Sequence, residues 1–275
     1  MTKKTVGLIA GMGKLPRFIA KDAKERGYRV VAVGLDPVAD DEGLEASVDV
    51  LERINVGKLD KVIKTLKRNG VAEAVMAGKV PKELLYKSRI TPDLRAVKLL
   101  WALKDRSDDT LLLAITGELE KDGIRLLETT AFCSGLLAPE GGMTKRQPTK
   151  AQWKDIEWGF AMAKEIGRLD IGQTVVVKDQ AVMAVEAIEG TDRAIKRGGK
   201  LAGGGAVVVK TAKPAQDLRF DVPAVGLSTV LAMIEAEAAV LAVEAGATLL
   251  LEKEKVLKEA EEAGIAIVGY TPRRR

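Results

Sequence analysis

The sequence contains no histidine and a single cysteine, Cys133, in 275 residues. One cysteine excludes an internal disulfide and a cysteine zinc cluster, and it fits a reducing cytoplasm. Without histidine, the usual ligands of borderline metals are missing, so only a hard cation held by oxygen atoms remains, with Mg²⁺ the leading candidate. Any hydrolytic chemistry must therefore rest on carboxylates, lysine, arginine, hydroxyl groups or such a metal ion.

Aromatic residues are also scarce, at 4%, and no apolar run is long enough to cross a bilayer. Nucleic-acid modules combine a basic stripe with stacking aromatic side chains. Here the net charge of +5 is spread along the chain, so we expect no nucleic-acid partner. The exception is the arginine run at 273–275, which could be a solvated tail or could be weakly attracted to an anionic membrane surface.

Hydrophobic residues make up 47% and charged residues 30% of the chain, a composition typical of a globular protein with a full core. The first half alternates apolar runs with segments of helical periodicity. Strands are expected at 5–11, 28–35, 71–78 and 124–132, and helices at 15–27, 58–69, 93–103 and 109–121. Such alternation predicts an α/β fold with βαβ units and a Rossmann-like parallel sheet.

The second half begins after a stretch rich in glycine, proline and polar residues. We therefore predict a Rossmann-like N-terminal domain at 1–134, a linker at 135–150 and a distinct catalytic α/β domain at 151–275. In the last of these we expect helices at 152–169, 191–199, 228–238 (capped by Ser228) and 253–264, a hairpin over 174–187 turning at 178–180, and strands at 206–210 and 265–270.

The first motif is GLIAGMGKLP, in which Gly11 and Gly13 stand between a predicted strand and a predicted helix. Such a turn exposes backbone N–H groups and a helix N-terminus, a geometry that binds anions. The dinucleotide fingerprint would require a third glycine where Pro16 stands. The motif thus reads as a phosphate or nucleotide contact, with Gly11 and Gly13 binding substrate, or as a purely structural tight turn.

The second motif, AGKVP, follows the third predicted strand and contains Gly78 and Lys79. In open α/β sheets, ligands gather outside the carboxyl ends of the strands. Gly78 and Lys79 are therefore candidates for phosphate binding, and the alternative is a solvated lysine in a turn.

The third motif, VEAIEGTDRAIKRGG, places Glu186 and Asp192 around the turn that contains Thr191. Thr191 or Asp192 could simply cap the following helix. The same helix N-terminus, with Thr191, could hold a phosphate, while Glu186 and Asp192 could hold Mg²⁺.

The fourth motif, KPAQDLRFDVPAVG, alternates Asp217, Arg219 and Asp221, which on an extended strand would share one face. They could form a structural ion-pair network. They could also serve pyrophosphate hydrolysis, in which carboxylates hold a metal ion, cations neutralise phosphoryl charge and one carboxylate orients or deprotonates water.

These motifs, in this order along the whole chain and followed by AVEAG and VGY, resemble the LpxI-type UDP-2,3-diacylglucosamine pyrophosphatases of lipid A synthesis. The resemblance implies cleavage of UDP-2,3-diacylglucosamine to lipid X and UMP with Mg²⁺, in a cytoplasmic protein peripheral to the inner membrane. It implies an N-terminal Rossmann-like domain and a distinct C-terminal domain. The family's acidic residue in the DxPxxG segment matches Asp221.

The motifs and the family resemblance both lead to one hypothesis, in which the pyrophosphate lies between the domains and Asp221 positions a metal-bound water. Asp217 and Glu186, with Asp192, would complete the metal shell, while Arg219, Lys210 and Lys79 would offset the charge of the pyrophosphate. The partner is then a lipid-linked nucleotide sugar, and we expect a homodimer. Two other classes stay open: a non-catalytic nucleotide-sugar or phospholipid binder, and a Rossmann oxidoreductase, which Pro16 disfavours.

Overall fold

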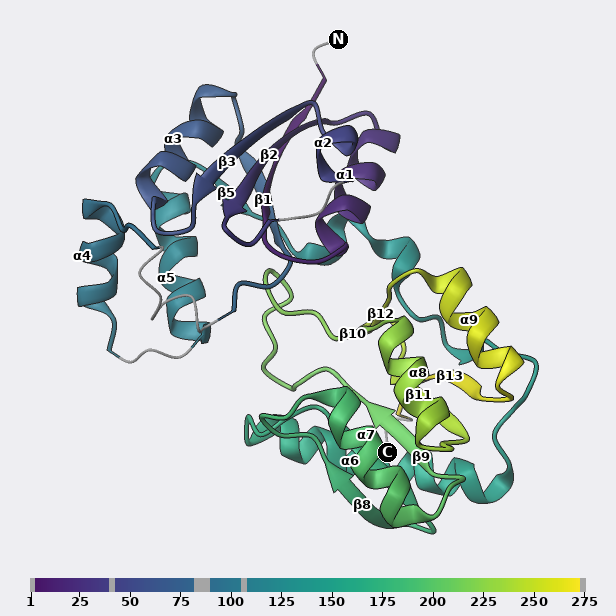
Figure 1. Cartoon of the computed structure of the whole chain (residues 1–275). Helices are drawn as coiled ribbons and strands as arrows, with labels where there is room; N and C mark the ends of the chain where they lie inside the picture. Colours follow the sequence, from purple (N-terminus) through teal and green to yellow (C-terminus); the bar gives the residue numbers. More distant parts are fainter. Residues whose placement is uncertain (1–2, 40–42, 82–89, 105–107, 273–275) are drawn as a thin grey trace. The chain divides into compact units, whose positions relative to one another are not determined.

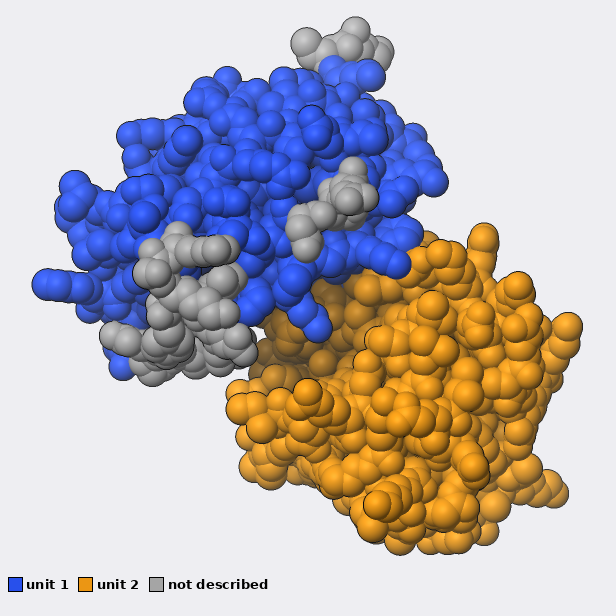
Figure 2. Space-filling view, viewed as in Figure 1, with its two compact units in different colours: residues 1–134, 218–220 blue, residues 135–217, 221–275 orange. Residues whose placement is uncertain are grey.

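The computed structural model describes residues 3–39, 43–81, 90–104 and 108–272. The chain divides into two compact units, coloured separately in Figure 2. Unit 1 comprises Met1–Ser134 with Leu218–Phe220, and unit 2 comprises Gly135–Asp217 with Asp221–Arg275. The predicted arginine tail at 273–275 lies outside the described residues. Within the described residues, no helix is long and apolar enough to span a bilayer.

Unit 1 is built on a sheet of five parallel strands in the order β3-β2-β1-β4-β5. The strands are β1 (Thr5–Ala10), β2 (Arg29–Asp36), β3 (Val50–Asn55), β4 (Glu73–Ala77) and β5 (Arg125–Leu126). The strands β1 and β2 are buried along almost their whole length, as expected when helices cover both faces of a parallel sheet. This order is that of a Rossmann-like sheet, and the predicted α/β fold class is confirmed.

Helices cover both faces of this sheet (Figure 1), and α1, α3 and α4 are amphipathic segments that bury one side. They are α1 (Leu15–Glu25), α2 (Leu44–Ser47), α3 (Leu59–Arg68), α4 (Leu94–Ala102) and α5 (Asp108–Lys121). Two sequence predictions need correction. Strand β3 was missed because its Glu52 and Arg53 interrupt the apolar run. The strand predicted at 124–132 ends after Leu126, and its second half is the 3₁₀ turn Thr129–Phe132.

Unit 2 contains a six-stranded mixed sheet in the order β6-β13-β11-β9-β7-β8. The strands are β6 (Gly141–Gly142), β13 (Ala266–Tyr270), β11 (Val240–Glu244), β9 (Val207–Lys210), β7 (Thr174–Lys178) and β8 (Ala181–Val185). Strands β9, β11 and β13 run parallel to one another. Strand β7 runs in the opposite direction to its two neighbours, because it pairs antiparallel with both β9 and β8. The predicted hairpin is confirmed. A short parallel pair, β10 (Ala224–Val225) with β12 (Leu249–Leu250), stands apart.

Alternate residues of the unit 2 strands pack against helices on opposite faces. On one face, Val176, Val208 and Leu241 pack with α7 (Thr191–Ala202), α8 (Leu227–Glu235) and α9 (Lys253–Glu262). On the other face, Val175 and Val209 pack with α6 (Lys150–Arg168). The side chain of Lys210, two residues after Val208, therefore points to the face covered by α7 and α8.

Residues 135–150, which the composition predicts to be a linker, lie in unit 2. Strand β6 pairs antiparallel with β13, and Ala138 is buried in the core beneath α8 and α9. The segment is mostly exposed, but it packs closely at single points, such as the carbonyl of Pro139, for which Gly269 of β13 leaves room. The boundary between the units therefore falls at Ser134.

Candidate functional site

The two glycine motifs of unit 1 meet at the ends of neighbouring strands. Strands β1 and β4 are adjacent although β2 and β3 lie between them in the sequence, which makes this edge the point where strand order reverses. Beyond the strands, Met12 and Lys79 exchange backbone hydrogen bonds of 2.9 Å in both directions, and Gly11 N–H donates to Ala77 O. Such a switch point is where open α/β sheets bind ligands.

Gly11 and Gly78 have a structural reason to be glycine. A Cβ on Gly11 would lie 2.7 Å from the carbonyl oxygen of Lys79, and one on Gly78, at φ +90°, would lie 2.7 Å from the carbonyl carbon of Gly11. Gly13, in contrast, has φ +102° and its Cβ would meet no described atom within 4 Å. Gly13 therefore leaves its side of the turn open, whereas Gly11 and Gly78 let two backbone segments touch.

Helix α1 begins directly after this turn, with Pro16 in its first turn. Among the described residues, no side chain caps its N-terminus. Pro16 is buried, so proline occupies the position of the third fingerprint glycine without preventing helix–strand packing. Lys79 is exposed beside the turn. The switch point thus presents N–H groups, a helix N-terminus and a nearby cation, which is chemistry suited to an anionic ligand.

In unit 2, three predicted residues form one hydrogen-bonded chain. Lys210, at the end of β9 and only 4% exposed, donates from Nζ to Thr191 Oγ1 at 2.8 Å. Thr191 Oγ1 in turn donates to Glu186 Oε1 at 2.6 Å. Glu186 directly follows β8 and is 9% exposed. The predicted capping role of Thr191 is wrong: Gly190 is the N-cap of α7, and the Thr191 hydroxyl serves Lys210 and Glu186 instead.

Two helix N-termini lie together at this edge. Thr229 Oγ1, in the first turn of α8, donates to Asp192 Oδ1, in the first turn of α7, at 3.2 Å. Both helices begin at a glycine, Gly190 and Gly226, and within the described part of the chain neither has a side-chain cap. Ser228 therefore does not cap α8 as predicted. Uncapped N–H groups beside the buried ammonium of Lys210 favour a bound anion.

An unsatisfied hydroxyl supports the same interpretation. Thr174, the direct cross-strand partner of Lys210, is fully buried, and its Oγ1 has no hydrogen-bond partner among the described residues. Directly paired strand residues project from the same face, so this hydroxyl lies beside the Lys210 side chain. Buried hydroxyl groups are normally paired, and an unpaired one adjacent to a buried cation fits a missing ligand.

The segment with Asp217, Arg219 and Asp221 is not the extended strand that their alternation suggested. Residues 218–220 form a turn, and the N–H of Asp221 donates to the carbonyl of Asp217 at 3.1 Å. The three side chains therefore do not share one face of a strand. Asp221 is exposed, and its Oδ2 accepts a hydrogen bond of 2.6 Å from Gln216 Nε2.

Arg219 belongs to unit 1, whereas Asp217 and Asp221 belong to unit 2. The guanidinium of Arg219 lies 3.9 Å from Glu120 Oε1 and 5.7 Å from the ring centroid of Phe220. Thr129 fixes the backbone there, because its N–H donates to Leu218 O and its hydroxyl to Arg219 O. Contacts within unit 1 therefore help to position Arg219.

The same segment is anchored where it leaves β9. Lys164 Nζ of α6 donates to both Glu244 carboxylate oxygens, at 2.8 and 2.7 Å, and to Ala212 O at 2.9 Å. Glu244, the last residue of β11, also accepts from Ala212 N–H at 2.8 Å. Sequence reasoning missed these residues and Gln216. Glu244 carried a signal, an acid ending a buried strand, whereas Lys164 is identified only by its tertiary contacts.

The predicted Mg²⁺ ligands Asp221, Asp217, Glu186 and Asp192 are not gathered into one cluster of carboxylates in the described part of the chain. In the described ranges, no group of three acidic or cysteine side chains could hold a metal ion. Glu186 and Asp192 instead accept hydrogen bonds from threonine hydroxyl groups, and Asp221 from Gln216. Mg²⁺ is usually held by one or two carboxylates together with water and substrate phosphates, so an ion here would be bound by one or two of these side chains and not by a cluster of them.

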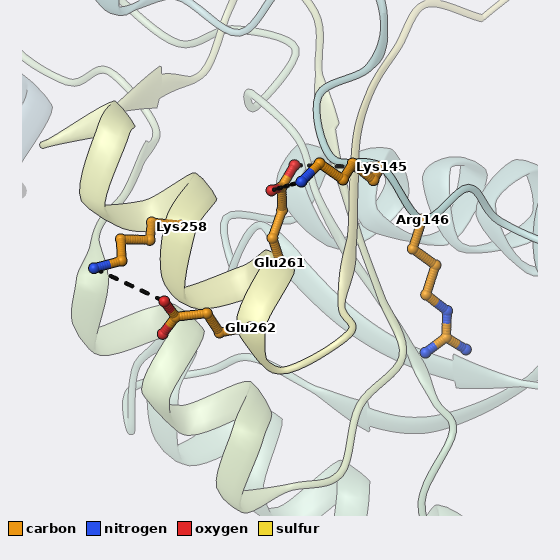
Figure 3. A pocket seen from close by; sticks show the side chains of 5 residues that line it. All are labelled: Lys145, Arg146, Lys258, Glu261 and Glu262. Carbon is orange, nitrogen blue, oxygen red and sulfur yellow. Dashed lines mark hydrogen bonds and ion pairs between the residues drawn. The ribbon is translucent and has the colours of Figure 1, made fainter.

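A surface pocket of about 340 Å³ lies elsewhere in unit 2 (Figure 3). Its lining side chains are Lys145, Arg146, Lys258, Glu261 and Glu262. Lys145 lies 3.5 Å from Glu261 and Lys258 lies 3.8 Å from Glu262, so opposite charges offset each other. The pocket contains none of the predicted residues, and its chemistry is that of a solvated, ion-paired surface.

These features define a two-unit α/β protein with a Rossmann-like first unit and a polar, anion-suited strand edge in the second. The model of the LpxI N-terminal domain matches residues 5–136, and that of the LpxI C-terminal domain matches residues 139–268. The UDP-2,3-diacylglucosamine pyrophosphatase LpxI of Caulobacter vibrioides is 32% identical over 285 residues, covering 99% of each chain. The chain belongs to the LpxI family, and the predicted resemblance is confirmed.

Solved structures are far less similar. Phosphoribosylglycinamide synthetase from Anaerococcus prevotii aligns at 13% identity and a TM-score of 0.29, over 70% of this chain but only 34% of that one. N5-carboxyaminoimidazole synthetase from Staphylococcus aureus aligns at 19% identity and a TM-score of 0.23, over 64% and 39% of the two chains. Likeness at this level carries no argument about function.

Proposed function

We propose that this protein hydrolyses the pyrophosphate bond of UDP-2,3-diacylglucosamine, giving UMP and 2,3-diacylglucosamine 1-phosphate (lipid X). Water adds to one phosphorus, the bridging P–O bond breaks, and the water protons leave to a base or to solvent. The proposal rests on family membership and on one observation, the buried Lys210 ammonium at the paired N-termini of α7 and α8. That arrangement suits a phosphate group of the substrate.

Within unit 2, the residues divide by chemistry. Lys210, Thr191 and the N–H groups of α7 and α8 would bind phosphate oxygens and stabilise the charge that develops on them. Asp221 would orient or deprotonate the attacking water, with Gln216 holding one of its oxygens at 2.6 Å. Asp217 fixes the turn through its carbonyl, which accepts from Asp221 N–H. Arg219, which belongs to unit 1, would offset pyrophosphate charge, as predicted from the sequence.

In unit 1, the switch point would contact the nucleotide portion of the substrate. Gly13 leaves the turn open, the N-terminus of α1 supplies N–H groups, and Lys79 supplies a positive charge. Gly11 and Gly78 would contribute by holding the two loops together. The backbone of this turn would therefore carry most of the contact, with the charge of Lys79 beside it.

Magnesium dependence remains a prediction from the family resemblance. Because the described carboxylates do not converge, no step above is assigned to a metal ion. Mg²⁺ would in any case neutralise pyrophosphate charge if the substrate brings it in complex.

The cellular setting follows from the substrate. A diacylated nucleotide sugar resides in a bilayer, so we propose a cytoplasmic protein that binds the inner-membrane surface peripherally. Support comes from α4, where Trp101 is 87% and Leu94 81% exposed, with the exposed Lys98 between them. Tryptophan, leucine and lysine on one helix face are typical of helices that lie in a membrane interface. A homodimer remains a further proposal.

The decisive experiment measures UMP release from UDP-2,3-diacylglucosamine in detergent micelles, with Mg²⁺ and with excess EDTA, for the wild type and Asp221→Ala. We expect release by the wild type and none by a folded Asp221→Ala protein. Activity at about a tenth of wild type or more in this variant would remove Asp221 from its central role. Ligand binding without any release would instead favour a nucleotide-sugar or phospholipid binding protein.

A further inference from the structure

The hydrogen-bond chain of Lys210, Thr191 and Glu186 can run in only one direction. A lysine ammonium donates and cannot accept, whereas a carboxylate accepts and cannot donate. The Thr191 hydroxyl, 2.8 Å from Lys210 Nζ and 2.6 Å from Glu186 Oε1, must therefore accept from Lys210 and donate to Glu186. Glu186 thereby determines which way the hydroxyl proton points, and so which lone pairs of Thr191 face Lys210.

Glu186 is itself held rigidly. Its N–H donates to Thr174 O at 2.8 Å, and its second carboxylate oxygen accepts from Gln173 N–H at 3.4 Å. The backbone of Gly172 packs so closely that a Cβ there would lie 2.1 Å from the carbonyl oxygen of Glu186. Thr174 and Gly172 thus hold the backbone of Glu186, and Gln173 contacts its carboxylate, so this carboxylate is suited to orienting a hydroxyl.

Thr191 is equally constrained, as the first residue of α7. Gly190 adopts φ +85°, a conformation that glycine allows and that turns the chain into the helix at this point. The hydroxyl of Thr191 thus lies at the helix N-terminus, next to the N–H groups proposed to bind phosphate. Any shift of this hydroxyl would move the Lys210 ammonium relative to those N–H groups.

We infer that Glu186 is a positioning residue, which acts through Thr191 to hold the Lys210 ammonium toward a phosphate of the substrate, and not a metal ligand. This inference rests on the proposed function of Lys210. It assigns Glu186 a role that differs from the one its sequence context suggested, and it makes two predictions that a metal ligand would not share. The effects of Glu186 and Thr191 are coupled, and an uncharged acceptor can replace Glu186.

The test is a double-mutant cycle on UMP release by the full-length protein. Glu186→Leu and Thr191→Val should each lower kcat/KM about tenfold, the effect of one hydrogen bond to a charged group. The double variant should also lose about tenfold, because both changes break the same chain. A loss of about a hundredfold in the double variant would show independent roles and overturn the inference.

Conservative variants separate positioning from metal binding and from misfolding. Glu186→Gln and Thr191→Ser keep an acceptor and a hydroxyl, so we expect kcat/KM within about threefold of wild type. The Mg²⁺ concentration for half-maximal rate should stay unchanged in Glu186→Gln, and a rise of about tenfold would overturn the inference. Glu189→Gln is the matched control, since Glu189 lies in the same loop but pairs with the exposed Arg197.

A second readout keeps the inference separate from the proposed hydrolysis. Inorganic pyrophosphate should raise the melting temperature of the wild type and of Thr191→Ser, and should raise it much less in Thr191→Val and Glu186→Leu. If the wild type releases no UMP but this pattern holds, the proposed reaction fails and the positioning role stands. If all four proteins show the same shift, Glu186 does not position Lys210.

Discussion

Met12 and Lys79 exchange two backbone hydrogen bonds of 2.9 Å and so join the loops that follow β1 and β4. These loops are 67 residues apart in number and carry both glycine motifs of unit 1. The two loops can approach this closely because Gly11 and Gly78 have no side chains that would hold their backbones apart. The switch-point geometry of unit 1 thus depends on two glycines that need not touch a ligand.

This contact predicts different costs for neighbouring glycines. Gly11→Ala places a Cβ 2.7 Å from Lys79 O, so the loops must separate, and we expect a loss of about 2 kcal/mol in the stability of unit 1. Gly13→Ala meets only backbone strain at φ +102° and should cost about 1 kcal/mol. Hydrogen exchange of the β1 and β4 amides measures the loss of stability in each variant. Equal losses in Gly11→Ala and Gly13→Ala would contradict the tight contact.

Gln216 is predicted to support Asp221. Because Gln216 Nε2 donates to Asp221 Oδ2 at 2.6 Å, Gln216→Leu should lower kcat for UMP release about tenfold with folding intact. Gln216→Glu should lower it further, since a second carboxylate would repel Asp221. Wild-type kcat in Gln216→Leu would show that Asp221 needs no such support.

Acid should weaken unit 1 partly through Asp49. The N–H of Val30 donates to its carboxylate at 2.8 Å, and with Lys24 nearby this lowers the pKa of Asp49. A lowered folded pKa means that the stabilisation is present above the unfolded pKa, about 3.9, and is lost as pH falls through the folded pKa. Between about pH 5 and about pH 2, the free energy of unfolding should decrease less steeply with falling pH in Asp49→Asn than in the wild type, as measured from denaturant unfolding curves. Identical slopes would exclude this contribution.

The exposed face of α4 should bind membranes. Leu94→Ser combined with Trp101→Ser removes two large apolar side chains, and we expect sedimentation with phosphatidylglycerol vesicles to fall more than about tenfold. UMP release in detergent micelles should be unchanged. Leu231→Ser, which alters an exposed leucine of α8, is the control. Equal vesicle binding by all proteins would place the membrane contact elsewhere.

The buried Cys133 is expected to be unreactive in the folded protein. Burial raises the pKa of its thiol to about 12, so almost no thiolate is present near neutral pH. Its presence therefore adds no candidate nucleophile to the proposed site.

From the sequence one could predict the α/β class, the parallel sheet of unit 1 and most of its helices and strands, but not β3. Local signals suffice for this, since apolar runs such as 28–35 and the helical period at 58–69 follow from burial of neighbouring residues. The sequence also identified Lys210, Thr191 and Glu186 as polar residues at the ends of buried segments. Their residue types indicated a polar site, because few types of side chain, lysine, threonine and acidic residues among them, bind phosphate groups or metal ions.

The contacts that these residues make depend on how distant parts of the chain pack together. Alternation of Asp217, Arg219 and Asp221 fits a strand only where a neighbouring strand offers backbone partners, and here the Asp221 N–H bonds to Asp217 O in a turn. Glu186 accepts a hydrogen bond from the Thr191 hydroxyl because β8 ends beside the start of α7. Contacts between residues distant in sequence depend on strand register and helix packing, which local patterns do not encode.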